Sequence, residues 1–148
     1  MSINLPGISV IIPSYANDST NTAGSGLTAA LASLSNQTLS TDLFEVLVVF
    51  NGPAALDIEP DLADQFPQLN LRVLRTKAAG AGRARNLGIT SAGRRFVTFL
   101  DDDDALQPRF LETGLEHARN GACVLLPILD KGLDCLLYTS PSPRDATL

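Results

Sequence analysis

The sequence predicts an α/β fold that is doubly wound, with a mostly parallel sheet and helices on both of its faces. Three observations lead to this prediction. Short runs of β-branched and apolar residues alternate with segments of helical periodicity. Some of these runs hold almost no polar residue, which is typical of strands buried between two layers of helices. The chain of 148 residues, 45% of them hydrophobic, is long enough for one domain with its own core.

The first half of the chain contains three expected strands. Residues 8–12 are β-branched and apolar, and Pro13 is expected to end this central strand. A helix is expected next, because leucines and alanines from Leu27 to Leu34 recur at the spacing of one helical face. The remaining elements are a strand at 44–50, a weak helix at 59–66 and a short strand at 71–74.

The second half continues the alternation of strands and helices. A loop rich in glycine and alanine at 78–82 leads into a helix that Gly93 is expected to end. A strand at 96–100 follows, and we expect it to be buried on both faces. A helix that starts at Pro108 and a last strand at 122–126 complete the pattern.

Four consecutive carboxylates, Asp101 to Asp104, follow the strand at 96–100 without any spacer. Because open α/β sheets bind ligands at the carboxyl ends of their strands, these side chains are expected in a crevice. Adjacent carboxylates disfavour each other's ionisation, and a hard divalent cation such as Mg²⁺ or Mn²⁺ relieves that repulsion. The alternative is an acidic turn that is merely solvated.

The charge distribution indicates an anionic ligand. The net charge of −5 argues against general nucleic-acid binding. The window 65–100, however, contains no acidic residue and seven basic ones. These are Arg72, Arg75, Lys77, Arg83, Arg85, Arg94 and Arg95. A basic window that runs into four aspartates favours a phosphate group held by arginine and a bridging metal, although part of this window is expected to be an ordinary solvated surface.

The loop around Gly80 is a second candidate for binding an anion. A glycine-containing loop at a helix N-terminus directs free backbone N–H groups towards a ligand. The loop is not a P-loop, since no Gly-Lys-Ser/Thr follows it. A dinucleotide fingerprint is expected after the first strand, where Pro13, Ser14 and Tyr15 stand instead. Tyr15 either stacks on a base or packs at the rim of the sheet.

Five stretches in order resemble the inverting family 2 of glycosyltransferases, which have a GT-A fold. They are residues 10–15, 33–38, 45–49, Gly80 with 84–89, and 99–104. The resemblance covers roughly residues 8 to 125. It implies a nucleotide-diphosphate sugar as donor, a divalent metal ion as cofactor, and transfer of a hexosyl group to an acceptor hydroxyl with inversion.

The resemblance also implies roles for single residues. Pro13, Ser14 and Tyr15 match the strand-end residues that hold the nucleobase, and Arg85 matches an arginine near the base and the phosphates. Asp101, Asp102 and Asp103 match the Asp-x-Asp motif, in which the first carboxylate faces the ribose and the last binds the metal. Asp103 is therefore the expected metal ligand, and Asp104 matches a frequent companion.

The chain departs from the family pattern at three places. Arg83 stands where the family usually has a small residue, and it either adds a phosphate contact or points outward. Phe50 and Asn51 stand where the family usually carries an acidic residue facing the base, so the nucleobase stays open. Asn51 can still hydrogen-bond a base edge, because its amide offers a donor and an acceptor. The family's general base lies in a downstream part, so we expect this chain to be an inactive fragment. Residues 1–130 are the expected nucleotide-sugar-binding part, and 131–148 an expected non-native or disordered tail.

Other function classes fit the sequence less well. A non-catalytic module that binds nucleoside diphosphates is the main alternative. A phospho-acceptor receiver domain needs an acidic pair after the first strand, and a nucleotidyltransferase usually carries a glycine-rich basic loop there. The expected acceptor is a glycan or a lipid-linked glycan. Two cysteines and the lack of a secretory signal or a membrane-spanning run favour the cytoplasm, with the inner face of the membrane as an option.

Overall fold

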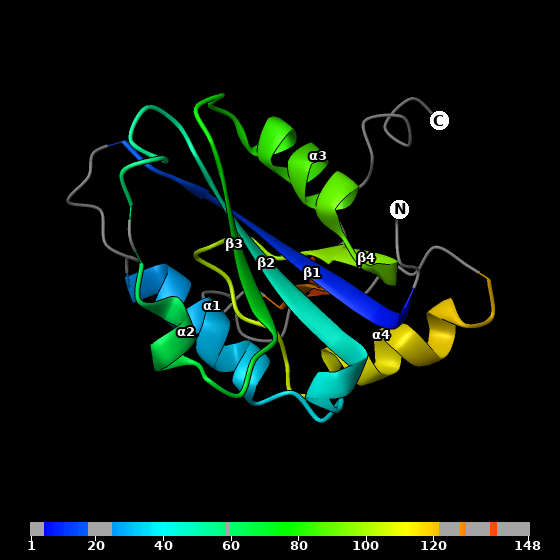
Figure 1. Cartoon of the computed structure of the whole chain (residues 1–148). Coiled ribbons are helices and arrows are strands. Elements are labelled where there is room, and N and C mark those ends of the chain that lie inside the picture. The colour runs from blue at the N-terminus through cyan, green and yellow to red at the C-terminus, as the bar shows by residue number, and fades with distance from the viewer. Residues whose placement is uncertain (1–4, 18–24, 59, 122–127, 130–136, 139–148) are drawn as a thin grey trace.

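A computed structural model describes residues 5–17, 25–58, 60–121, 128–129 and 137–138. Its main sheet has four parallel strands in the order β3-β2-β1-β4, so the predicted parallel α/β architecture is confirmed (Figure 1). The strands are β1 (Leu5–Tyr15), β2 (Phe44–Asn51), β3 (Leu71–Thr76) and β4 (Arg94–Phe99). A separate antiparallel pair joins β5 (Ile128–Leu129) to β6 (Leu137–Tyr138).

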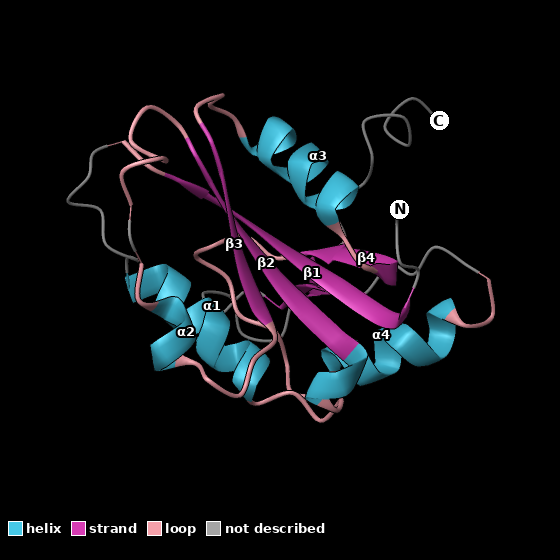
Figure 2. Ribbon diagram, in the orientation of Figure 1, coloured by secondary structure: helices cyan, strands magenta, loops and turns pink. Residues whose placement is uncertain are grey.

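Helices cover both faces of the sheet, as Figure 2 shows. The helix α3 (Ala81–Ser91) lies on one face. The opposite face carries α1 (Ser25–Ser35), the short α2 (Leu62–Gln65) and α4 (Phe110–Ala118). A single 3₁₀ turn, η1 (Thr41–Leu43), leads into β2. The predicted helix at 59–66 is therefore reduced to one turn.

Two apolar layers hold these helices on the sheet. On the α1 side, alternate residues of β1 and β2 pack against leucines of α1, α2 and α4. On the α3 side, Ile11, Leu47 and Val49 pack against Ala84. Gly88 allows α3 to approach β1 closely, because a Cβ atom at Gly88 would lie 2.5 Å from Cγ2 of the buried Ile11. This close contact holds α3 against the middle of β1.

The first strand does not end at Pro13, contrary to the prediction. It continues to Tyr15, and Pro13 pairs with Val49 of β2. Proline is tolerated here because its missing N–H would point towards β4, where the pairing of the two strands ends. The amide N–H of Leu100 donates to the carbonyl of Ile11 at 3.0 Å, and Pro13 stands where the next donor towards β4 would be. The ladder between β1 and β4 therefore stops here, and the chain turns away at Asp101.

The expectation that the strand at 96–100 is buried on both faces is wrong. Half-buried and exposed residues alternate along β4, and Val97 and Phe99 are 38% and 43% exposed. Both pair with β1 residues on the α3 side of the sheet, at Ser9 and Ile11. The reason is that α3 packs mainly over β1, β2 and β3, so it leaves this face of β4 partly exposed; at the end of the strand, Arg85 of α3 lies over Phe99.

Two of the predictions cannot be compared with the structure. The predicted strand at 122–126 lies outside the described residues. The division of the chain at residue 130 stays a prediction; within 131–148 only the two residues of β6 are described. Among the described residues, no helix combines the length and the apolar composition needed to cross a bilayer.

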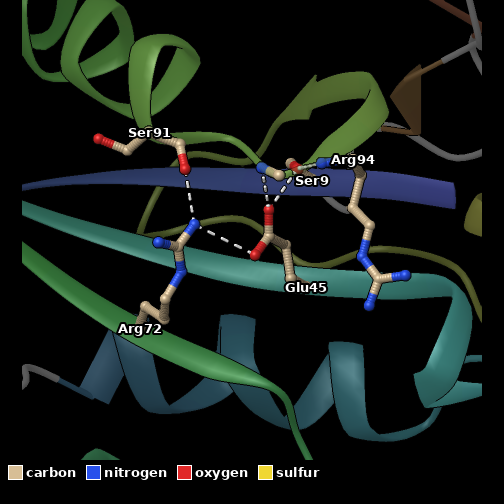
Figure 3. A network of polar contacts seen from close by, with 6 residues as sticks. Ser9, Glu45, Arg72, Ser91 and Arg94 are labelled. Carbon is tan, nitrogen blue, oxygen red and sulfur yellow. Dashed lines mark hydrogen bonds and ion pairs between the residues drawn. The ribbon is translucent and has the colours of Figure 1, made fainter. Parts of the chain in front are cut away.

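A buried carboxylate ties four segments together at the amino ends of the strands (Figure 3). Glu45 on β2 is 6% exposed, and its Oε1 accepts hydrogen bonds from the Ser9 hydroxyl at 2.7 Å and the Gly93 N–H at 2.6 Å. Arg72 on β3 donates to Oε2 at 3.2 Å and to the carbonyl of Ser91 at 2.6 Å. The network therefore anchors the C-terminal end of α3 to three strands.

This network makes stability depend on pH. Burial raises the pKa of Glu45, but the hydrogen bonds from Ser9 and Gly93 and the charge of Arg72 outweigh burial and bring the pKa below 4.5. The ionised form thus stabilises the fold above that pH, and the contribution disappears as pH falls through the lowered pKa. We expect Glu45→Gln to reduce the free energy of unfolding by about 1–3 kcal/mol at pH 7.

Urea unfolding of both proteins between pH 7 and pH 3 measures this effect. The difference in the free energy of unfolding between wild type and Glu45→Gln should shrink as pH falls below about 4.5. Glu116→Gln, at an exposed position on α4, serves as the control because it removes the same charge and is expected to change stability little. A difference that stays constant over this pH range contradicts the assigned role of the Glu45 carboxylate.

Candidate functional site

The predicted site residues converge at the carboxyl ends of the four parallel strands. Tyr15 ends β1, Asn51 ends β2, and the segment 101–104 follows β4. The loop after β3 leads through Gly80 into the N-terminus of α3. Since all strands are parallel, segments up to about 90 residues apart in the sequence meet at one edge of the sheet.

A direct hydrogen bond joins the first of these segments to the aspartates. The hydroxyl of Ser14 donates to Oδ2 of Asp102 at 2.8 Å. The start of α1 also lies against this turn, because a Cβ atom at Gly26 would be 2.7 Å from the carbonyl oxygen of Asp102. The Asp102 carboxylate thus already accepts a hydrogen bond from within the protein, and it points to the end of β1.

The other three aspartates form a cluster of their own. Asp101, Asp103 and Asp104 can each offer one carboxylate oxygen, with these oxygens within 4.8 Å of one another. Partial burial and the charges of Asp103 and Asp101 raise the pKa of Asp104. Three exposed carboxylate oxygens that lie close together and repel one another fit a hard divalent cation such as Mg²⁺ or Mn²⁺. This donor set includes the predicted ligand Asp103, whose role stays a prediction.

Arg85 is the cation that borders this cluster. Its Nη2 atom lies 2.9 Å from Oδ1 of Asp101, and its guanidinium carbon lies 5.9 Å from the centre of the Phe99 ring. Both partners sit at the carboxyl end of β4, while Arg85 itself projects from the first half of α3. The ion pair is partly exposed, so a phosphate group could reach the guanidinium from solvent.

The seven basic residues of the 65–100 window do not act together. Arg72 pairs with Glu45 at the opposite end of the strands, and Arg94 donates there to the carbonyls of Pro6 and Asp42. Arg75 donates to the carbonyl of Ile58. Among the described contacts, Arg85 alone joins this window to the aspartates. The basic window therefore contains more arginines than one phosphate site can use. The strands place Arg72 and Arg94 at one end of the sheet and Arg85 at the other.

Gly80 and Asn51 stand side by side at this edge. Gly80 is the N-cap of α3 and has a φ of 122°, a backbone conformation that residues other than glycine rarely adopt. Its N–H donates to Oδ1 of Asn51 at 3.0 Å, and Nδ2 of Asn51 donates to the carbonyl of Ser14 at 3.0 Å. Asn51 is 2% exposed. The predicted contact of Asn51 with a base edge is not tested, but its amide is already engaged on both sides.

Tyr15 lies at the rim of the same edge, and Pro13 lies two residues before it in β1. Tyr15 is 53% exposed, and its ring lies over Gly52, where a Cβ atom would be 2.8 Å from Cε2. Pro13 is buried within β1. The ring of Tyr15 is therefore placed where an aromatic ligand could stack on it, and the choice between stacking and rim packing stays open.

Two contributors to this site were not predicted. Phe99 supports the guanidinium of Arg85, and Gly26 permits the close approach of α1 to the aspartate turn. The apolar run at 96–100 gave no sign of Phe99's role, because the exposure of its ring depends on which strands α3 covers. Nothing in the local sequence distinguishes Gly26, because its partner lies on a segment more than 70 residues away.

Comparison with known proteins identifies relatives of the chain. A family model described as glycosyl transferase family 2 matches residues 9–144. The glycosyltransferase AglE of Haloferax volcanii is 35% identical over 118 residues, which are 78% of this chain and 36% of AglE. The minor teichoic acid biosynthesis protein GgaA of Bacillus subtilis is 27% identical over 71% of this chain and 23% of its own length.

A solved structure supports the same relationship. The structure of TarS residues 1–349 from Staphylococcus aureus in complex with UDP-GlcNAc superposes with a TM-score of 0.62 at 27% identity. The match covers 77% of this chain and 31% of that one. TarS is named a poly(ribitol-phosphate) β-N-acetylglucosaminyltransferase. The present chain thus spans about a third or less of the length of these relatives.

Proposed function

Because the chain belongs to glycosyl transferase family 2, we propose that it carries the donor site of a glycosyltransferase. The proposed donor is a nucleotide-diphosphate sugar, bound with Mg²⁺ or Mn²⁺. One observation supports this most strongly: three clustered carboxylates, the guanidinium of Arg85 and the Ser14–Tyr15 segment lie at one edge of the sheet. Structures of the relative TarS contain UDP and UDP-GlcNAc, which supports a donor of this class.

The proposed reaction is a single displacement with inversion. An acceptor hydroxyl attacks the anomeric carbon, the bond from that carbon to the diphosphate oxygen breaks, and the hydroxyl proton passes to a general base. A bound divalent ion supplies Lewis-acid neutralisation of the leaving diphosphate. Asp103 would hold this ion, with the carboxylates of Asp101 and Asp104 in reach.

The remaining residues bind and orient the donor. Arg85 adds fixed positive charge beside the diphosphate as negative charge develops there. The N-terminus of α3 at Gly80 directs backbone N–H groups to the same side. Tyr15, Ser14 and Pro13 border the region proposed for the nucleobase. For this chain alone we expect donor binding without transfer, because the family's general base is expected in a downstream part.

The proposed acceptor is a glycan or lipid-linked glycan of the cell envelope. The support comes from relatives, since GgaA is named for minor teichoic acid biosynthesis and TarS for transfer to poly(ribitol-phosphate). The cytoplasmic location, including the inner face of the membrane, stays a prediction.

Isothermal titration calorimetry tests the donor site. Nucleoside diphosphates, beginning with UDP, are titrated into the chain with Mn²⁺ and again with EDTA, and the matching nucleoside and monophosphate serve as controls. We expect at least one diphosphate to bind with Mn²⁺ and to lose about tenfold or more in affinity without it. Equal affinity for nucleoside and diphosphate, unaffected by Mn²⁺, would refute a metal-bridged diphosphate site.

A further inference from the structure

Asn51 occupies a position from which it contacts two loops of the proposed donor site at once. It is the last residue of β2 and is 2% exposed. Its Nδ2 donates to the Ser14 carbonyl and its Oδ1 accepts from the Gly80 N–H, both at 3.0 Å. The orientation of the amide is fixed by chemistry, because a carbonyl can only accept and a backbone N–H can only donate.

The two partners of Asn51 belong to a closed circuit of contacts. Ser14 continues it through its hydroxyl to Asp102, next to Asp101 in the aspartate turn. Gly80 continues it through α3 to Arg85, which pairs with Asp101. The circuit encloses the edge at which the diphosphate and its metal are proposed to bind. On the β2 side, Asn51 links the part of the circuit that runs through Ser14 to the part that runs through Gly80.

The backbone around Asn51 reinforces this link. The Asn51 carbonyl accepts from the N–H of Ala16 at 2.7 Å, and the N–H of Gly52 donates to the carbonyl of Thr76 at 3.1 Å. The ends of β1, β2 and β3 are thereby held together around one side chain. An aspartate at this position could accept from Gly80 but could not donate to Ser14, and alanine could do neither.

We propose that Asn51 is a positioning residue, which does not contact the donor but sets the distance between the nucleobase side and the phosphate side of the site. This inference rests on the proposed donor site. Its physical basis is that donor groups must be held in place before binding, since small displacements of a binding group cost large factors in affinity or rate. Removal of the amide should release Ser14 and Gly80 from each other without removing any atom that touches the ligand.

The test compares Asn51→Ala and the isosteric Asn51→Asp with Ser9→Ala. Ser9 is the control because it is equally buried and polar but donates to Glu45 at the opposite end of the strands. For each folded protein, the affinity for UDP with Mn²⁺ is measured by calorimetry, the thermal midpoint by circular dichroism, and the exchange rate of the Gly80 amide by NMR. If UDP is not the preferred nucleotide, the tightest diphosphate of the panel replaces it.

Asn51→Ala should bind the diphosphate about tenfold or more weakly, and it should bind inorganic pyrophosphate with Mn²⁺ more weakly as well, although pyrophosphate has no nucleobase for Asn51 to contact. Ser9→Ala should have a lower thermal midpoint but an affinity within twofold of wild type. The Gly80 amide should exchange faster in Asn51→Ala than in Asn51→Asp, which keeps the acceptor. Wild-type affinity in Asn51→Ala, or an equal loss of affinity in Ser9→Ala, overturns the inference. A wild-type protein that binds no diphosphate instead overturns the proposed donor site.

Discussion

Asp103→Asn is expected to lower the affinity of the chain for a nucleoside diphosphate in the presence of Mn²⁺ by about tenfold or more, up to the full loss caused by EDTA. The substitution keeps the size of the side chain and removes one of three clustered carboxylates. Without the Asp103 carboxylate, the remaining aspartates hold the cation less tightly, since Oδ1 of Asp101 already pairs with Arg85. Calorimetric titration of the tightest-binding diphosphate at one fixed, subsaturating Mn²⁺ concentration measures the loss.

The expected loss is specific to the metal-bridged complex. With EDTA, wild type and Asp103→Asn should bind the same diphosphate equally weakly. Glu116→Gln, which removes one negative charge from an exposed position on α4, should bind like wild type. Unchanged affinity of Asp103→Asn with Mn²⁺ would exclude this carboxylate as a metal ligand.

Arg85→Met is expected to change nucleotide and metal affinity in opposite directions. The affinity for a diphosphate with Mn²⁺ should fall about tenfold or more, because a charged hydrogen-bond donor to phosphate is lost. The affinity for Mn²⁺ alone should rise, because Oδ1 of Asp101 no longer lies 2.9 Å from a competing guanidinium. Titration of Mn²⁺ followed by electron paramagnetic resonance, with and without the diphosphate, measures both quantities.

Arg83→Met is the matched control, since it removes the same charge from an exposed position two residues earlier on α3. We expect it to change both affinities less than threefold. Loss of Mn²⁺ affinity in Arg85→Met would mean that the guanidinium orients Asp101 for the metal and does not compete with it. That outcome contradicts the opposite signs expected here.

The elements of the fold were predictable because their signals are local. The β-branched runs at 8–12 and 44–50 each specify a strand, and regular leucine spacing specifies α1. The meeting of Ser14 with the aspartates followed as well, because parallel strands bring their carboxyl ends to one edge.

The contacts that were not predictable depend on tertiary placement. Asn51 has partners 37 and 29 residues away, so its sequence neighbours cannot reveal that its amide is engaged. The exposure of Phe99 follows from which strands α3 covers, and an apolar run alone does not specify that. Arg72 belonged to a basic window in the sequence, but its position on β3 directs it to Glu45 at the far end of the sheet.

Paramagnetic broadening by Mn²⁺ in ¹H–¹⁵N spectra tests the central claim most directly, because it shows which residues lie near the bound metal. With a nucleoside diphosphate present, substoichiometric Mn²⁺ should broaden the amides of Asp101 to Asp104 first, followed by those of Ser14 and Gly80. Asp61 and Asp64 form a second acidic pair, in which Asp64 raises the pKa of Asp61, and their amides should stay sharp. Equal broadening at both acidic groups, or broadening confined to Asp61 and Asp64, would contradict a metal–diphosphate site at the carboxyl ends of the strands.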